Sequence, residues 1–253
     1  MARSASGTPT GEIASRILWE DNHLIAVNKR PGELVQGDKT GDTCLLEQLR
    51  EFIRVREAKP GETFMGLVHR LDRPTSGCVL FARTSKALSR MNAALRERAI
   101  RKIYWVAADG VPDGIADSGA DGGWLTLEDW LLRDPKQNRS RAVPAGTAHA
   151  KQARMRIRVR AAGRTLYLLE AEIETGRHHQ IRAQLAARGI HCHGDVKYGA
   201  RRGLPDRSIG LHARALEFEH PVRRQLLRIE APAPDSGFWS ELSSGLTASS
   251  GWK

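Results

Sequence analysis

The most reactive group of residues stands in one nine-residue run, HRLDRPTSG, over positions 69–77. This run places the carboxylate of Asp72 between the guanidinium groups of Arg70 and Arg73. Its Pro and Gly indicate a shaped loop rather than the interior of a helix or strand. Because neighbouring cations favour the ionised form of a carboxyl group, Asp72 suits the role of a nucleophile or base better than that of an acid. The alternative is a salt-bridged turn without chemistry, which the local composition alone favours.

A second pattern is the strict alternation of arginine with apolar residues over 154–160, RMRIRVR. As a β-strand this run puts four arginines on one face, with Arg156 and Arg158 at its centre. Arginines on one face recur about every 6.7 Å, roughly the spacing of phosphates along a nucleic-acid strand. The run therefore predicts either a phosphate-binding ribbon that contacts substrate or a solvated outer face, and the pattern does not decide between them.

Several side chains that can bind a metal gather in the segment 178–193. They are His178, His179, His191, Cys192 and His193. Their spacing fits none of the usual Cys and His templates for zinc, and only one of them is a cysteine. We therefore expect no metal site in this segment.

Short apolar runs, separated by Gly, Pro or charged residues, predict the strands that must position these groups. The runs lie at 24–27, 78–82, 103–108, 166–173 and 226–232. Helical spacing of apolar residues predicts fewer helices, at 43–57, 85–99 and 178–188. Many strands, few helices and no strict alternation of the two predict an α+β protein with a mixed, largely antiparallel central sheet flanked by a few helices.

The ends and one internal stretch differ in composition from the rest. Residues 1–11 and 240–253 are rich in small and polar residues, so we expect two disordered tails around one domain over 12–239. The glycine-rich stretch 109–123 lacks the spacing of a phosphate-binding loop. We expect a mobile surface excursion there.

The overall composition limits the partners and the compartment. The 253 residues include 40 Lys and Arg against 29 Asp and Glu, a net charge of +11 that favours an anionic partner such as nucleic acid. No apolar run approaches the roughly 18 residues of a membrane span, and the amino-terminal end has no apolar signal-peptide core. Three widely spaced cysteines argue against a disulfide framework. We expect a cytoplasmic monomer without membrane contact or an obligate protein partner.

The segment 69–77 resembles the motif around the catalytic aspartate in the RluA-type branch of the pseudouridine synthases. Other stretches resemble further marks of that branch in the same order, and together the matches span roughly 17–238. These stretches are ILWEDNHLIAVNKRPG (17–32), RKIYWV (101–106), ETGRHHQIRAQLAARGIHCHGDVKYG (174–199) and LHARALEFEHPV (211–222). Two departures stand out: Arg30 replaces a residue that is commonly Pro, and His178 replaces the Ser or Thr that usually follows TGR.

The resemblance implies a pseudouridine synthase fold with the active-site cleft across the sheet, and a role for several residues. Asp72 is then the catalytic carboxylate, and Arg182 pairs with it and keeps it oriented. Arg70 enters the RNA stack in place of the flipped uridine, and Tyr104 stacks against the target base. Arg177 and Gln180 are implied to support the site or contact phosphate.

The implied activity is the isomerisation of uridines in structured ribosomal or transfer RNA, without a cofactor. Rearranging a base on its own sugar involves no oxidation, hydrolysis or transfer to another molecule, so one ionised carboxylate can carry it. The base must first leave the stack, which requires a pocket and a side chain to fill the gap. Two other classes remain open: an idle RNA-binding relative, and a glycoside-cleaving enzyme in which Asp195 or Glu174 supplies a second acid.

Overall fold

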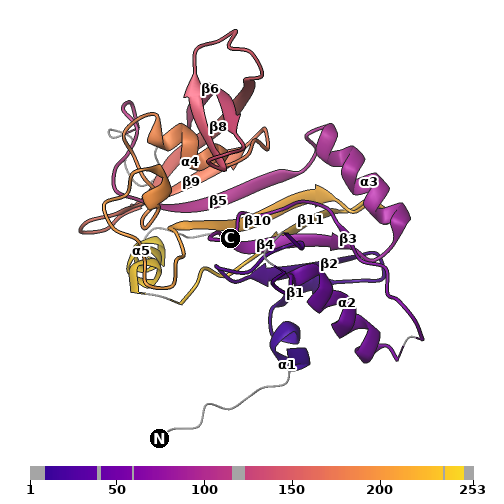
Figure 1. Ribbon diagram of the computed structural model, residues 1–253. Helices are drawn as coiled ribbons and strands as arrows, with labels where there is room; N and C mark the ends of the chain where they lie inside the picture. Colours follow the sequence, from indigo (N-terminus) through magenta and orange to yellow (C-terminus); the bar gives the residue numbers. More distant parts are fainter. Residues whose placement is uncertain (1–8, 39–40, 59, 116–122, 236, 248–253) are drawn as a thin grey trace, which may run out of the picture.

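The computed structural model describes residues 9–38, 41–58, 60–115, 123–235 and 237–247. Within these residues eleven strands form one sheet in the order β1-β2-β4-β10-β5-β9-β8-β6-β7, with β3 paired to β4 and β11 paired to β10 (Figure 1). The strands are β1 (Ile17–Glu20), β2 (Leu24–Lys29), β3 (Gly66–Leu67), β4 (Ser76–Ala82), β5 (Arg101–Ala108), β6 (Leu125–Asp134), β7 (Arg139–Val143), β8 (Lys151–Ala162), β9 (Tyr167–Ile173), β10 (Leu211–Glu219) and β11 (Leu226–Glu230).

Few helices accompany this sheet. They are α1 (Pro9–Ala14), α2 (Leu45–Arg56), α3 (Ser85–Arg96), α4 (Gln180–Ala186), α5 (Gly237–Thr247) and the 3-10 helix η1 (Val196–Tyr198). The three helices expected from apolar spacing correspond to α2, α3 and α4, and no end differs from its expected position by more than three residues. The prediction of an α+β protein with a mixed, largely antiparallel sheet is confirmed.

The strands β2 and β4 separate two parts of the core because their side chains alternate in direction. Ile25 and Val27 face a cluster that includes Leu49 of α2. Leu24 and Ala26 face a second cluster, which includes Met91 of α3. The two helices therefore cover opposite sides of this part of the sheet.

Strands β4 and β10 run parallel and join the two halves of the sheet beside the loop that carries Asp72. Gly77 at this junction has φ +114°, and a Cβ there would lie 2.3 Å from the carbonyl oxygen of Ala213. Only glycine fits so close an approach of two backbones. The glycine of HRLDRPTSG therefore lets the loop end directly against the sheet.

The predicted tail over 240–253 is wrong for its first half. Helix α5 continues to Thr247, and Trp239 and Leu242 are buried against Ala107 and Leu168. The many small and polar residues of this helix explain why its two buried apolar residues gave only a weak helical pattern in the sequence. At the other end, α1 begins at Pro9, inside the expected tail, while 1–8 and 248–253 lie outside the described residues.

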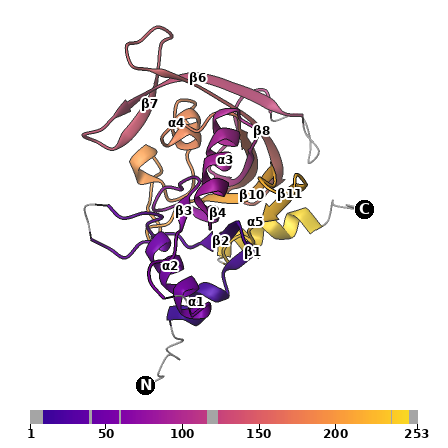
Figure 2. The same ribbon diagram turned by 90° about the vertical axis from the view of Figure 1, so that its right-hand side faces the viewer.

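Two further regions complete the outline of the chain. The strands β6 and β7 form a long hairpin that stands out from the body of the molecule (Figure 2), and the apolar runs did not predict it. Of the expected excursion at 109–123, residues 116–122 lie outside the described residues. The start of that stretch is anchored, because the Asp109 carboxylate accepts a hydrogen bond from the backbone N–H of His191.

Candidate active site

The loop that carries Asp72 is held from inside the protein by Lys29, the residue at the end of β2. The Lys29 side chain is 1% exposed, and its Nζ donates to the carbonyl oxygens of Arg30, Arg73 and Thr75 at 2.6–3.0 Å. Burial lowers the pKa of Lys29 to about 7. Since two of the three acceptors belong to the residues one and three positions after Asp72, the Lys29 side chain fixes the backbone of the loop on which the carboxylate stands.

The charged partner of Asp72 is Arg182 on α4, which lies 110 residues away in the sequence. Its Nη1 donates to Asp72 Oδ2 at 3.1 Å, so the contact expected from the resemblance is confirmed. The same guanidinium group donates from Nε and Nη2 to the two oxygens of Asp195, at 2.6 and 2.8 Å. Arg182 and Asp195 are 4% and 2% exposed, whereas the side chain of Asp72 is 28% exposed. A buried, bidentate pair therefore holds the cation that orients a more open carboxylate.

Tyr198 of η1 completes the surroundings of Arg182. Its ring centre lies 4.8 Å from the Arg182 guanidinium carbon, a cation–π distance. Its hydroxyl accepts a hydrogen bond from the backbone N–H of Ser140 and lies 2.9 Å from Nδ1 of His179. The segment GDVKYG thus supplies both the carboxylate and the ring that fix one arginine. The sequence analysis missed these two roles, for which the proximity of Asp and Tyr in one short turn was the only signal.

His179 lies between Tyr198 and Asp72. Its Nε2 is 3.5 Å from Asp72 Oδ2, and its backbone adopts φ +52° at the residue that precedes α4. Burial, together with the charge of Arg182, lowers the pKa of His179 to about 2, so the ring is neutral at ordinary pH. A neutral imidazole in this place can orient the carboxylate without competing with Arg182 for its charge.

Tyr104 stands on β5 and faces the same side of the sheet as Ala171 and Ala213, its neighbours in register. Its side chain is 8% exposed. Burial and the negative charge of Asp72 raise the pKa of Tyr104, so its hydroxyl stays protonated at neutral pH. The site therefore combines one ionisable carboxylate with an uncharged aromatic ring.

The two arginines beside Asp72 in the sequence behave differently from the expectation that they enclose it. Arg73 turns away, and it donates to the carbonyl oxygen of Gly32 at 3.0 Å and to Asp42 at 2.7 Å. Arg70 is exposed, and within the described part of the chain it forms neither an ion pair nor a side-chain hydrogen bond. Adjacent residues in a turn point in different directions, so the local salt-bridged turn is not formed around Asp72.

Gln180 and Arg177 differ in burial and in how many of their polar groups are already hydrogen-bonded. Gln180 is 4% exposed, and its amide donates to the carbonyl oxygen of Arg154 and accepts from Thr175 and from the Arg177 backbone. Of the two roles implied for Gln180, contact with phosphate does not fit, because its polar atoms are buried and occupied, whereas support of the turn before α4 does fit. Arg177 is half-buried and donates from Nε to the carbonyl oxygen of Gln152.

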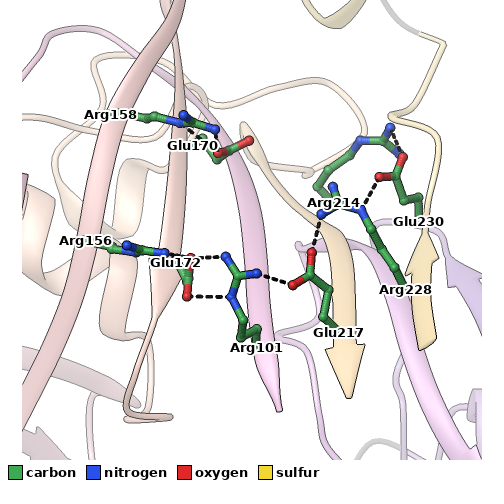
Figure 3. Close-up of polar contacts among 9 residues, drawn as sticks. All are labelled: Arg101, Arg156, Arg158, Glu170, Glu172, Arg214, Glu217, Arg228 and Glu230. Atoms are coloured by element: carbon green, nitrogen blue, oxygen red, sulfur yellow. Dashed lines mark hydrogen bonds and ion pairs between the residues drawn. The ribbon is translucent and has the colours of Figure 1, made fainter. Parts of the chain in front are cut away.

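Arg156 and Arg158 lie on the side of the sheet that faces away from Tyr104. On β9 their register partners are Glu172 and Glu170, whereas the partner of Tyr104 is the intervening Ala171. Arg156 pairs with Glu172 at 2.7 Å, and Arg158 pairs with Glu170 at 2.5 Å (Figure 3). Because these carboxylates occupy both guanidinium groups, the solvated outer face is favoured over the phosphate-binding ribbon.

The histidines of the segment 178–193 do not gather at one point, although the rings of His178 and His179 stack with their centroids 3.7 Å apart. In His178, Nδ1 lies 3.0 Å from Oγ of Ser140 and Nε2 lies 3.1 Å from Oδ1 of Asn138. In His191, Nδ1 lies 2.9 Å from Oδ2 of Asp109. Among the described residues, no group of three or more His, Cys, Asp or Glu side chains is placed to hold a metal ion. No helix within the described part of the chain is long and apolar enough to span a membrane.

With this geometry in place, comparison with known proteins identifies the family. The family model for RNA pseudouridylate synthase matches residues 23–187. A protein named ribosomal large subunit pseudouridine synthase C from Escherichia coli O157:H7 is 32% identical over 231 residues, which cover 88% of this chain and 68% of that protein. An RNA pseudouridine synthase, YhcT, from Bacillus subtilis is 33% identical over 86% of this chain and 68% of its own length.

The chain therefore belongs to the RNA pseudouridylate synthase family, in its RluA-type branch, and the resemblance seen in its motifs is confirmed. It is an RNA pseudouridine synthase, an isomerase. The solved structure of human RNA pseudouridylate synthase domain containing 4 has a TM-score of 0.72 to this fold at 22% identity, and covers 94% of this chain and 95% of its own. That likeness supports the fold alone.

The glycoside-cleaving alternative finds no second acid in the site. Asp195 is buried, and both of its oxygens accept hydrogen bonds from Arg182, so neither oxygen faces a substrate. Glu174 pairs with Arg154 at 3.3 Å. Neither carboxyl group is placed as the acid that such a mechanism requires.

Proposed function

We propose that the protein isomerises specific uridines of large-subunit ribosomal RNA to pseudouridine, with Asp72 as the catalytic carboxylate. One observation carries the proposal. The Asp72 side chain is 28% exposed, while the buried Arg182 holds one of its oxygens at 3.1 Å. A carboxylate in this setting is oriented by a fixed cation on its inner side and stays open to a substrate on its outer side.

The reaction needs only one such group. The bond between the uracil ring nitrogen and the ribose breaks, the base turns, and ring carbon five bonds to the same sugar carbon. The proton on carbon five leaves, and the ring nitrogen gains one, so the atoms balance without a second reactant. The position of Asp72 is compatible with attack on the base, attack on the sugar carbon or removal of a sugar proton. We expect no metal or organic cofactor to be required.

The roles of Arg70 and Tyr104 follow from the need to take the base out of the stack. Flipping a nucleotide costs a few kcal/mol and leaves a gap in the RNA. Arg70 is exposed and, within the described residues, unpaired, so its side chain is available to fill that gap. The ring of Tyr104, uncharged and near Asp72, supplies a stacking surface for the flipped base.

The choice of substrate rests on two supports. The relative from Escherichia coli O157:H7 is named for the ribosomal large subunit. The net charge of +11 suits a large polyanion such as ribosomal RNA. Transfer RNA is the alternative outcome of the experiment below.

The test compares RNA from cells with and without the gene, and pseudouridine is mapped in both ribosomal and transfer RNA. The proposal predicts that one or a few pseudouridines of large-subunit ribosomal RNA disappear with the gene. Purified protein should restore them on an unmodified transcript, and the Asp72→Asn variant should not. Loss of sites only in transfer RNA would overturn the proposed substrate, and loss of none in any RNA would overturn the activity.

A further inference from the structure

A polar hollow of about 250 Å³ lies where α3 leads into β5, apart from the contacts of Asp72. The end of α3 and the residues after it supply Arg96 and Arg98, and β5 supplies Lys102. The turn between β9 and α4 closes the other side with Glu174 and Arg177. Four of the five charged groups around this hollow are cations.

The cations of the hollow lack carboxylate partners. Within the described part of the chain, no ion pair involves Arg96, Arg98 or Lys102. The one carboxylate of the hollow, Glu174, is engaged by Arg154 at 3.3 Å. Arg177 uses only its Nε, which donates to the Gln152 carbonyl oxygen. These cations are thus available to an anion from outside.

Lys102 is half-buried at the edge of the hollow. Burial lowers the pKa of Lys102, which shows that the protein supplies little negative charge to stabilise its ammonium group. Gly176 faces Lys102, and a Cβ at that position would lie 3.4 Å from Nζ. A glycine here leaves room beside the ammonium group for a ligand atom.

The hollow lies on the same side of the sheet as the active site. Lys102 and Tyr104 are two residues apart on β5, so their side chains point the same way. Arg177 is two residues before His179, which lies 3.5 Å from Asp72. A strand of RNA with one nucleotide at Asp72 can therefore pass over the hollow.

We propose that this hollow binds a backbone phosphate of the RNA, close to the nucleotide that enters the active site. The inference rests on the proposed function and names a contact that fixes the strand. Arginine forks suit the oxygens of a phosphate diester, and a partly desolvated lysine adds a point charge. One phosphate held here sets the register of the strand and so positions a single uridine at Asp72.

The test removes two of these charges and compares the result with two charges removed elsewhere. The double variant Arg96→Gln/Arg98→Gln is matched by Arg54→Gln/Arg224→Gln, since Arg54 and Arg224 are exposed and paired with exposed glutamates. Binding of an unmodified large-subunit ribosomal RNA transcript is measured from about 50 to about 300 mM salt. Turnover is measured at saturating RNA.

The hollow variant should bind the transcript about tenfold more weakly at low salt, with a shallower dependence of log affinity on log salt. The control variant should keep both the slope and the turnover of the parent. If the two variants have equal slopes and the parent makes pseudouridine, the phosphate site is wrong and the proposed function stands. Conversely, a parent that modifies no uridine refutes the proposed function, whatever the slopes.

Discussion

The two sides of the central sheet use arginine in opposite ways. On the side away from Tyr104, Arg101 binds Glu172 and Glu217, and Arg228 binds Glu217 and Glu230, so that cations and carboxylates alternate across β8, β9, β5, β10 and β11 (Figure 3). On the side of Tyr104, one buried arginine serves two carboxylates, while Arg70, Arg96 and Arg98 lack carboxylate partners within the described residues. We therefore expect RNA binding to depend on the arginines without a carboxylate partner rather than on the number of arginines on a face.

Apart from the loss of the Asp72 carboxylate itself, the largest effect should come from altering the arginine between the two carboxylates. Arg182→Lys keeps the charge but loses the fork that binds Asp195 and Asp72 at the same time. We expect turnover to fall by about 10² to 10³, with RNA affinity within a few fold of the parent. Single-turnover kinetics and a filter-binding assay measure the two quantities. A variant with near-parental turnover would mean that a point charge is enough.

The next effect concerns Asp195, which touches Arg182 and lies deeper than Asp72. Asp195→Asn keeps the shape and removes one of the two charges that stabilise the buried guanidinium group. We expect about tenfold slower turnover and a loss of about 3 kcal/mol in the free energy of unfolding, because a buried pair is broken. Urea unfolding and rate measurements check both. Unchanged turnover in a folded variant would show that Asp195 does not position Arg182.

The third effect is the pH dependence of the free energy of unfolding, to which His179 beside Asp72 contributes. The folded-state pKa of His179 is about 2, below the usual 6.5, so the unfolded chain binds a proton as the pH falls through 6.5 while the folded protein does not. The native state therefore loses stability as the pH falls from about 6.5 towards 2. Between pH 7 and pH 5, His179 should contribute about 1 to 2 kcal/mol of that loss.

The check is the difference between the parent and His179→Gln in urea unfolding at the two pH values. His69 and His212 also have pKa values of about 4, lowered by burial, and they act in the same direction in both proteins. The variant should lose less stability than the parent on acidification. An equal loss in the two would show that His179 titrates normally.

The smallest effect is expected on the paired face. Replacing Arg156 and Arg158 by Gln removes two positive charges but also frees Glu172 and Glu170. We expect the slope of log affinity for RNA against log salt to match the parent, with a change in stability of about 1 kcal/mol for these partly exposed pairs. A clearly shallower slope would restore the phosphate-binding ribbon and break the contrast between the two sides.

Much of this architecture could be predicted from the sequence, because strands and helices leave local patterns. The apolar runs predicted β2, β4, β5, β9 and β11, and the motifs pointed to Asp72 and Arg182. The tail prediction failed because few apolar residues, among them Trp239 and Leu242, are enough to anchor a helix that is otherwise rich in small and polar residues.

Side-chain partners were harder to predict than elements. Gln180 looks like a surface polar group in the sequence, yet its amide is buried by a turn that folds back onto β8. The alternation in 154–160 correctly placed Arg156 and Arg158 on one face, but it could not reveal the glutamates of β9 opposite them. Pairing across strands depends on register, which a single local pattern does not contain.

The central claim is that the carboxylate of Asp72, held by Arg182, carries the isomerisation. The most direct test is turnover of Asp72→Asn on unmodified large-subunit ribosomal RNA, with binding of the same RNA measured in parallel. The amide keeps the shape and loses the charge, so pseudouridine should fall below detection while affinity stays within about twofold of the parent. Turnover within about tenfold of the parent would contradict the account.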